Sequence, residues 1–165
     1  MIFVTLGSQK FQFNRLLREI DRLIESGEIR EPVYAQTGYS DYVPQHYEFQ
    51  AFMDREEYKR CEESADIIIT HGATGSIISA VKKGRKVIAV PRLKKYGEHV
   101  DDHQIQLIRE FRRQNLICGL KDVSELSRGL LYVKEHTFDS YQGNTEAIIK
   151  SIDSYIESTV VRHER

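Results

Sequence analysis

The stretch Asp66-Ile-Ile-Ile-Thr-His-Gly-Ala-Thr-Gly-Ser76 decides the fold class of this chain. After the aspartate it carries an unbroken β-branched run, which is typical of a central parallel strand buried on both faces. Glycines and hydroxyl side chains follow, and then Ile77, Ile78 and Val81 mark a short helix that ends at Gly84. We therefore predict a strand, a polar loop and a helix in that order.

Strands and helices alternate in the same way along the whole chain. The predicted strands cover residues 2–6, 32–36, 47–52, 66–70, 87–90 and 116–118. The predicted helices cover residues 13–24, 55–64, 77–84 and 102–114, followed by two further helices and a frayed charged tail at about 158–165. Asp54 is the expected N-cap of the second helix, with Glu57 completing a capping-box pattern. This order predicts an α/β, Rossmann-like doubly wound fold with a mainly parallel sheet, formed by residues 1–165 as one domain.

Composition excludes several classes of protein. Lys and Arg total 24 and Asp and Glu total 25, so the net charge of −1 argues against a nucleic-acid binder. Cys61 and Cys118 lie far apart, as expected for reduced thiols of a cytoplasmic protein. We find no signal peptide and no run that approaches the roughly 20 apolar residues of a membrane span. If the protein works at a membrane, we expect another molecule to hold it there.

The first candidate site is the turn Gly7-Ser8-Gln9, which follows the first predicted strand. Ligands of open α/β sheets bind beyond the carboxyl ends of the strands, where such turns lie. Glycine lets the backbone approach a ligand, while the Ser8 hydroxyl and free amides can donate to phosphate oxygens. Taken alone, these three residues are explained as well by a plain strand-to-helix turn.

The second candidate is the loop from His71 to Ser76. Its glycines permit tight turns, its hydroxyls are donors, and the positive dipole end of the next helix favours a diphosphate. The pattern is neither a Walker A loop nor a G-x-G-x-x-G turn. In the alternative interpretation, Ser76 only caps the helix and His71 is an ordinary turn residue. We favour anion binding.

The third candidate is the segment from Pro91 to Gln104. Its polar residues are Arg92, Lys94, Lys95, Glu98, His99, Asp101, Asp102, His103 and Gln104. The two histidines are four residues apart, but the surrounding Pro91 and Gly97 predict an extended loop, and the sequence indicates no third ligand for zinc. We therefore expect no metal. One of the two aspartates is the expected N-cap of the following helix, and the basic residues suit either phosphate neutralisation or plain solvation.

Together these loops carry a resemblance to a known family. The run Thr70 to Pro91, with Gly97-Glu-His99, Asp102-His-Gln104 and the opening Phe3 to Gln9, resembles the C-terminal domain of family 28 glycosyltransferases, which have the GT-B fold. The match runs from residue 2 to about residue 112. The chain is similar in length to the small PssE-type subunits of capsule and exopolysaccharide glycosyltransferases. These are similar to the catalytic subunit of the two-part eukaryotic enzyme that adds the second N-acetylglucosamine to dolichol-linked sugar.

This resemblance implies a function for half of an enzyme. A single GT-B donor-binding half would hold a UDP-sugar, and a membrane-anchored partner of the PssD type would hold a lipid-linked acceptor. The expected reaction transfers a hexose or uronic acid with inversion, and it uses no cofactor beyond the donor substrate. The expected location is the cytoplasm, at the inner face of the membrane through the partner.

The resemblance also assigns roles to individual residues. Gly7, Ser8 and Gln9 would face the donor diphosphate. The phosphate and nucleoside would be lined by His71, Gly72, Ala73, Thr74, Gly75 and Ser76, with Arg92 and Ser79 close by. His99 and Gln104 would approach the donor sugar, and His99 is the only local candidate for the general base, which tends to come from the other half. Many members carry a ribose-binding Glu where this chain has Ser79.

Two alternatives remain open on the sequence. Besides the catalytic subunit described above, the chain could be a non-catalytic helper that enhances a companion transferase, or a sugar-nucleotide or dinucleotide enzyme of ordinary Rossmann type. A dinucleotide enzyme would need an acidic residue about 20 residues beyond the glycine turn, and residues 18–26 are predicted to be helical surface instead.

Overall fold

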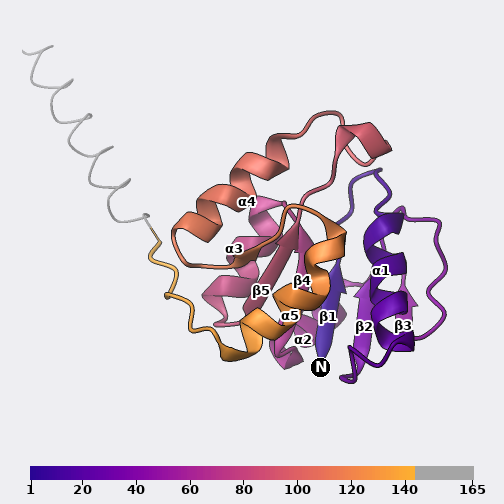
Figure 1. Ribbon diagram of the computed structural model, residues 1–165, viewed down its shortest axis with the longest axis horizontal. Helices are drawn as coiled ribbons and strands as arrows, with labels where there is room; N and C mark the ends of the chain where they lie inside the picture. The colour runs from indigo at the N-terminus through magenta and orange to yellow at the C-terminus, as the bar shows by residue number, and fades with distance from the viewer. Residues whose placement is uncertain (144–165) are drawn as a thin grey trace, which may run out of the picture.

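The computed structural model describes residues 1–143 and has a six-stranded sheet at its centre (Figure 1). The strand order is β3-β2-β1-β4-β5-β6, and every pair is parallel. The strands are β1 (Ile2–Thr5), β2 (Val33–Gln36), β3 (Glu48–Gln50), β4 (Ile67–His71), β5 (Lys86–Val90) and β6 (Cys118–Gly119). The predicted doubly wound α/β fold is confirmed, with a sheet that is entirely parallel.

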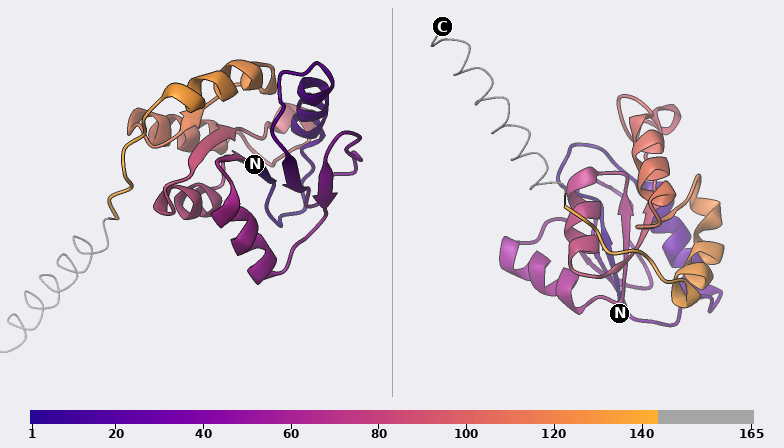
Figure 2. Two further views of the ribbon diagram at one scale, coloured as in Figure 1. Left: turned by 90° about the horizontal axis from the view of Figure 1, so that it is seen from below. Right: turned by 90° about the vertical axis from the view of Figure 1, so that its left-hand side faces the viewer.

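Helices cover both faces of the sheet (Figure 2). One face packs against α1 (Asn14–Glu25) and α5 (Leu126–Glu135). The other packs against α2 (Arg55–Ser64), α3 (Thr74–Lys82) and α4 (His103–Arg113). Two short 3₁₀ turns, η1 (Lys94–Tyr96) and η2 (Val123–Glu125), lie in the connections after β5 and β6.

The two central strands explain the hydrophobic runs of the sequence. Phe3 of β1 and its partner Ile68 of β4 belong to the core on the α2–α3–α4 face. The next pair, Val4 and Ile69, belongs to the core on the α1–α5 face. Because successive side chains point to opposite faces and both faces are covered, each position of these strands must be apolar or internally satisfied.

Several predicted boundaries shift by a few residues. The third strand pairs only over Glu48–Gln50, and the last strand lies at Cys118–Gly119 because only these residues reach β5. Helix α3 begins at Thr74, so part of the predicted loop is the first helical turn. The second of the two expected C-terminal helices and the charged tail lie outside the described residues. Within residues 1–143, no helix is long and apolar enough to span a bilayer.

The predicted capping box at α2 is half right. Asp54 caps the helix, since its carboxylate accepts a hydrogen bond from the Glu57 amide at 2.8 Å. The Glu57 carboxylate does not complete the box. It accepts hydrogen bonds from Gln50 Nε2 at 2.7 Å and from the Tyr34 hydroxyl at 3.3 Å instead. These bonds tie α2 to β2 and β3.

The topology indicates where ligands bind in sheets of this kind. The chain winds outward from β1 through β2 to β3, then crosses back to β4 and winds in the other direction. The connections after β1 and β4 therefore diverge between two adjacent strands, which makes this the switch point of the sheet. In Figure 1 the strands run upward from the labelled N-terminus, so the switch point lies at the upper edge of the sheet.

Candidate functional site

The structure brings the first two candidate loops into contact at the switch point. Gly7 has a φ of +70°, and a Cβ built there would lie only 2.9 Å from Cε1 of His71. Thr70 braces the two strands, because its hydroxyl donates to the Thr5 carbonyl at 3.0 Å. Glycine is required at position 7 both by its backbone conformation and by this contact. Ser8 and Gln9 follow it as exposed residues.

The start of α3 is open to solvent. Thr74 and Gly75 are exposed, Ser76 is half-buried, and a Cβ built on Gly75 would meet no atom within 4 Å. The N-cap is Ala73, which offers no side-chain cap, so the alternative in which Ser76 caps the helix is wrong. The amides of the first turn precede the first intrahelical bond, which runs from Ile77 to Ala73 at 3.1 Å. Such amides, with the helix dipole, favour an anion.

His71 lies beneath this helix start as a neutral group. The side chain is buried, with 4% of the residue exposed. Burial, together with the nearby positive charge of Arg92, lowers the pKa of His71 to about 3. At physiological pH the imidazole therefore carries no charge and offers one donor and one acceptor nitrogen.

Arg92 is enclosed by protein, so plain solvation is ruled out, while its expected effect on a donor phosphate remains a prediction. The residue is 0% exposed, and its Nη2 donates to the carbonyls of Leu6 at 2.9 Å and Phe11 at 3.1 Å. Nε and Nη1 have no hydrogen-bond partner within residues 1–143. Burial lowers the pKa of Arg92 to about 10, so the side chain stays protonated at neutral pH. It clamps the turn after β1 and places a positive charge behind that turn.

Gln104 connects the ends of two strands. Its side-chain oxygen accepts hydrogen bonds from the amides of Gly72 at 3.1 Å and Arg92 at 3.0 Å. The residue is 3% exposed. A Cβ on Gly72 would lie 2.7 Å from the Gln104 Cβ, so Gly72 is required for close packing of α4 on β4. The structure thus gives both residues a structural role, and their expected contacts with a donor remain a prediction.

An ion pair that the sequence did not indicate anchors the segment after β5. Glu98 is 0% exposed and accepts hydrogen bonds from Arg15 Nε at 2.7 Å and Arg15 Nη2 at 3.0 Å. It also accepts from the Leu93 amide at 2.9 Å, while Arg15 reaches Asp122 at 2.9 Å. Arg15 and Glu98 are 83 positions apart, so no local pattern in the sequence could have paired them.

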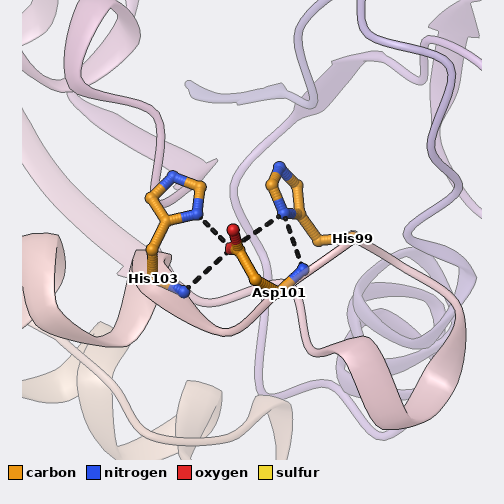
Figure 3. Close-up of side chains that lie close together, drawn as sticks. All are labelled: His99, Asp101 and His103. Atoms are coloured by element: carbon orange, nitrogen blue, oxygen red, sulfur yellow. Dashed lines mark hydrogen bonds and ion pairs between the residues drawn. The ribbon is translucent and has the colours of Figure 1, made fainter.

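Three polar side chains meet at the start of α4 (Figure 3). The Asp101 carboxylate lies between the rings of His99 and His103, 3.3 Å from His99 Nδ1 and in hydrogen-bond contact with His103 Nδ1. Asp101 also accepts from the His103 amide at 3.1 Å, so it satisfies the first amide of α4. Asp102 binds the Lys94 amide at 2.8 Å instead. The sequence indicated no third ligand beside the two histidines, and Asp101 overturns that premise.

Ser79 faces α2. Its hydroxyl donates to Glu62 at 3.0 Å, and the same carboxylate oxygen accepts from Lys83 Nζ at 2.5 Å. Glu62 is 2% exposed. The carboxylate that is absent from position 79 is therefore present nearby on another helix, where the Lys83 ammonium balances its charge. The expected contact between Ser79 and a ribose is an untested prediction.

This fold and the arrangement of its loops define a Rossmann-like α/β domain with its open helix start at the switch point. Residues 1–156 match the glycosyltransferase family 28 C-terminal domain, and the chain belongs to this family.

Related proteins agree with this assignment. The chain is 31% identical over 98 residues to the UDP-N-acetylglucosamine transferase subunit ALG13 of Yarrowia lipolytica, an alignment that covers 58% of this chain and 46% of the relative. A glycotransferase of kitacinnamycin shares the fold with a TM-score of 0.59 at 14% identity, over 82% of this chain and 35% of that one. MurG of Acinetobacter baumannii has a TM-score of 0.50 at 17% identity, over 79% and 41%. The chain thus spans less than half the length of each.

Proposed function

We propose that this chain is the donor-binding, catalytic subunit of a two-part inverting glycosyltransferase. It would bind a UDP-sugar and transfer a hexose or uronic acid to a lipid-linked acceptor in capsule or exopolysaccharide synthesis. The observation that carries the proposal is the open start of α3, which lies at the switch point beside Gly7 and His71. Family membership supports a transferase, and the relative from Yarrowia lipolytica is named as a subunit of a UDP-N-acetylglucosamine transferase.

The charge distribution suits a leaving diphosphate. Free amides and the hydroxyls of Thr74 and Ser76 supply hydrogen-bond donors at the positive end of α3. The buried guanidinium of Arg92 adds positive charge behind the turn at Gly7. Donors fixed before the reaction stabilise charge as it develops on the leaving group, because they need no reorganisation.

The opposite side of the switch point suits a dinucleotide poorly. Enzymes that bind NAD place an acidic residue after the glycine turn to hold the ribose. In this chain β2 ends at Gln36, whose side-chain oxygen accepts a hydrogen bond from the Met53 amide at 3.3 Å. A Cβ on Gly38 would lie 2.7 Å from the Gly7 carbonyl, so this connection already covers the turn. A nucleotide above α3 is therefore favoured over one above β2.

The second half of the proposed enzyme would be a membrane-anchored acceptor subunit. This chain corresponds to less than half of each related protein, and the relative from Yarrowia lipolytica is named as a subunit of its transferase. The general base for the acceptor hydroxyl would come from the acceptor subunit or from His99, which is the local candidate. The complex would work at the cytoplasmic face of the membrane.

Calorimetric titration with UDP, UDP-glucose, UDP-galactose and NAD tests donor binding. We expect a response to UDP and to one of the two UDP-sugars, and none to NAD. Gly75→Asp and Gly75→Ala form a matched pair, because a Cβ at this position meets no atom within 4 Å and an acidic residue near a helix start favours folding. The carboxylate should weaken UDP binding at least about tenfold, or 1.4 kcal/mol, while Ala should have little effect. Tight binding of NAD without UDP, or equal UDP affinity in both variants, would refute the proposal.

A further inference from the structure

His99, Asp101 and His103 form a compact cluster of possible metal ligands at the start of α4. One ligand atom from each side chain lies within 4.8 Å of the other two. The carboxylate lies between the two rings, as Figure 3 shows. The His99 side chain is 9% exposed, while Asp101 and His103 are 56% and 48% exposed. The cluster therefore has one nearly buried ligand and two that a dissolved ion can reach.

The segment that carries these side chains is held firmly without an ion. On one side Glu98 is fixed by Arg15 and by the Leu93 amide. On the other side Asp102 accepts from the Lys94 amide at 2.8 Å. The ring of Phe11 packs on His99 with 4.9 Å between the ring centres. Because the backbone is already ordered, a ligand would pay little conformational entropy to use the three side chains.

We propose that His99, Asp101 and His103 bind a divalent transition-metal ion, with zinc as the preferred class. Two imidazoles and one carboxylate are a common three-ligand set for zinc, and they leave a fourth position open. Ligand atoms about 2.0–2.1 Å from a tetrahedral ion lie about 3.3 Å apart, and Asp101 Oδ1 is 3.3 Å from His99 Nδ1. The closer contact between Asp101 and His103 opens by side-chain rotation, which their exposure permits.

Two carboxylates on the solvent side of the cluster favour a cation there. The Asp101 and Asp102 carboxylates are both exposed there. The buried guanidinium of Arg92 donates its Nη2 to the carbonyls of Leu6 and Phe11. The open coordination position would accept water, or a donor oxygen of the nucleotide sugar. The second possibility rests on the proposed function, and the first does not. With His99 bound to an ion, the general base of that function would come from the acceptor subunit.

Metal binding is measured on the full chain, purified without a histidine tag and freed of metal with EDTA. We expect one equivalent of Co²⁺ to give the visible absorption of a site with nitrogen and oxygen ligands, and Zn²⁺ to displace it. His103→Gln and Asp101→Asn should each weaken Zn²⁺ binding at least about tenfold. His46→Gln is the matched control, since His46 is an exposed histidine that also contacts an aspartate, and its binding should equal that of the unaltered chain.

Two results would overturn the inference. In the first, the EDTA-treated chain binds no stoichiometric metal, so the cluster is only a carboxylate hydrogen-bonded to two imidazoles. In the second, binding survives both variants, so another part of the chain holds the ion. The His103 side chain is exposed and lies at the first residue of α4, so His103→Gln should leave the circular dichroism spectrum unchanged.

A UDP titration in EDTA separates this inference from the proposed function. If the chain binds UDP but no metal, only the metal site is refuted. If it binds metal but no UDP, only the donor site is refuted. If the open position faces the donor, Zn²⁺ should tighten UDP binding in the unaltered chain but not in His103→Gln. If UDP affinity is unaffected by Zn²⁺, the coordination of a donor oxygen is excluded.

Discussion

Gly7, Gly72 and Gly75 all lie at the carboxyl edge of the sheet, but each is glycine for a different reason. Gly7 has a positive φ and contacts the His71 ring. Gly72 has no room for a side chain beneath α4, whereas Gly75 faces open space. Only Gly75 leaves a clear approach for a ligand. A glycine in a sequence does not show which of these constraints it serves.

Gly7→Ala should destabilise the fold more than Gly84→Ala. Both positions have a left-handed backbone, with φ of +70° and +69°, but only Gly7 has an atom close to a built Cβ. The strain common to both costs about 1–2 kcal/mol, and displacement of the His71 ring should add about 1 kcal/mol at position 7. Urea denaturation measures the two free energies of unfolding. Equal losses would show that the His71 ring moves aside freely.

His71 should make the stability fall in mild acid. Burial lowers the pKa of His71 from 6.5 to about 3. Between these two pH values the imidazole is protonated in the unfolded chain but neutral in the folded chain. Stability contributed by this difference is complete above pH 6.5 and is lost as the pH falls toward 3. The loss is about 1.4 kcal/mol per pH unit, or about 2 kcal/mol between pH 7 and pH 5.

Unfolding of the unaltered chain and of His71→Asn, measured at pH 7 and pH 5, isolates this effect. Other titrating groups are common to both proteins, so the difference belongs to position 71. We expect the variant to lose about 2 kcal/mol less than the unaltered chain over this interval. The same pH dependence in both proteins would mean that the imidazole is protonated in the folded state.

At the scale of elements, β4–α3 and β5–α4 are built differently. The chain passes from β4 into α3 within two residues, so the helix start is held directly by the strand. Between β5 and α4 it makes a longer excursion through η1, which depends on contacts with α1. The position of His99 therefore depends on the buried Glu98 carboxylate rather than on the strand.

Glu98→Gln should make the connection between β5 and α4 more mobile. The substitution removes the bidentate carboxylate and leaves Asp122 as the ion-pair partner of Arg15, so it should cost about 2 kcal/mol, the range of a lost charged hydrogen bond. Hydrogen exchange of residues 92–101 should accelerate, while that of β4 should not. Glu110→Gln on α4 is the control, since its pair with Arg113 is exposed and its loss should not be measurable. Unchanged exchange in the variant would show that other contacts hold the segment.

At the scale of the whole molecule, the sheet places its candidate site at an exposed edge. The open helix start, the turn at Gly7 and the His99 cluster all lie beyond the carboxyl ends of the strands. Thr74 and Gly75, at the start of α3 on this edge, are exposed to solvent. The proposed acceptor subunit would complete the site in the way that two domains enclose a ligand between them.

Sugar transfer should therefore require both subunits. We expect the purified chain to bind UDP but to transfer no labelled sugar to lipid, and transfer to appear when a membrane fraction with the acceptor subunit is added. Gly75→Asp should abolish transfer in the reconstituted system, and Gly75→Ala should preserve it. If Gly75→Asp leaves sugar transfer in the reconstituted system unchanged, the chain is a non-catalytic helper.

The sequence by itself determined the elements and the class of sheet. Continuous apolar strands and amphipathic helices are local patterns, because backbone geometry sets their periods. The unbroken run before His71 therefore located the central strand, and Asp54 located a helix start. The three polar loops could also be placed at one edge, since parallel strands align their carboxyl ends.

Only the tertiary structure decided what individual side chains do. Arg92 is buried and binds the carbonyl of Leu6, and Glu98 pairs with Arg15, which is 83 positions away. Asp101 lies between two histidines. These outcomes depend on the desolvation of charges and on contacts between distant elements, for which a local sequence pattern carries no information. The sequence therefore indicated which groups are polar, but it could not indicate which of them the fold buries.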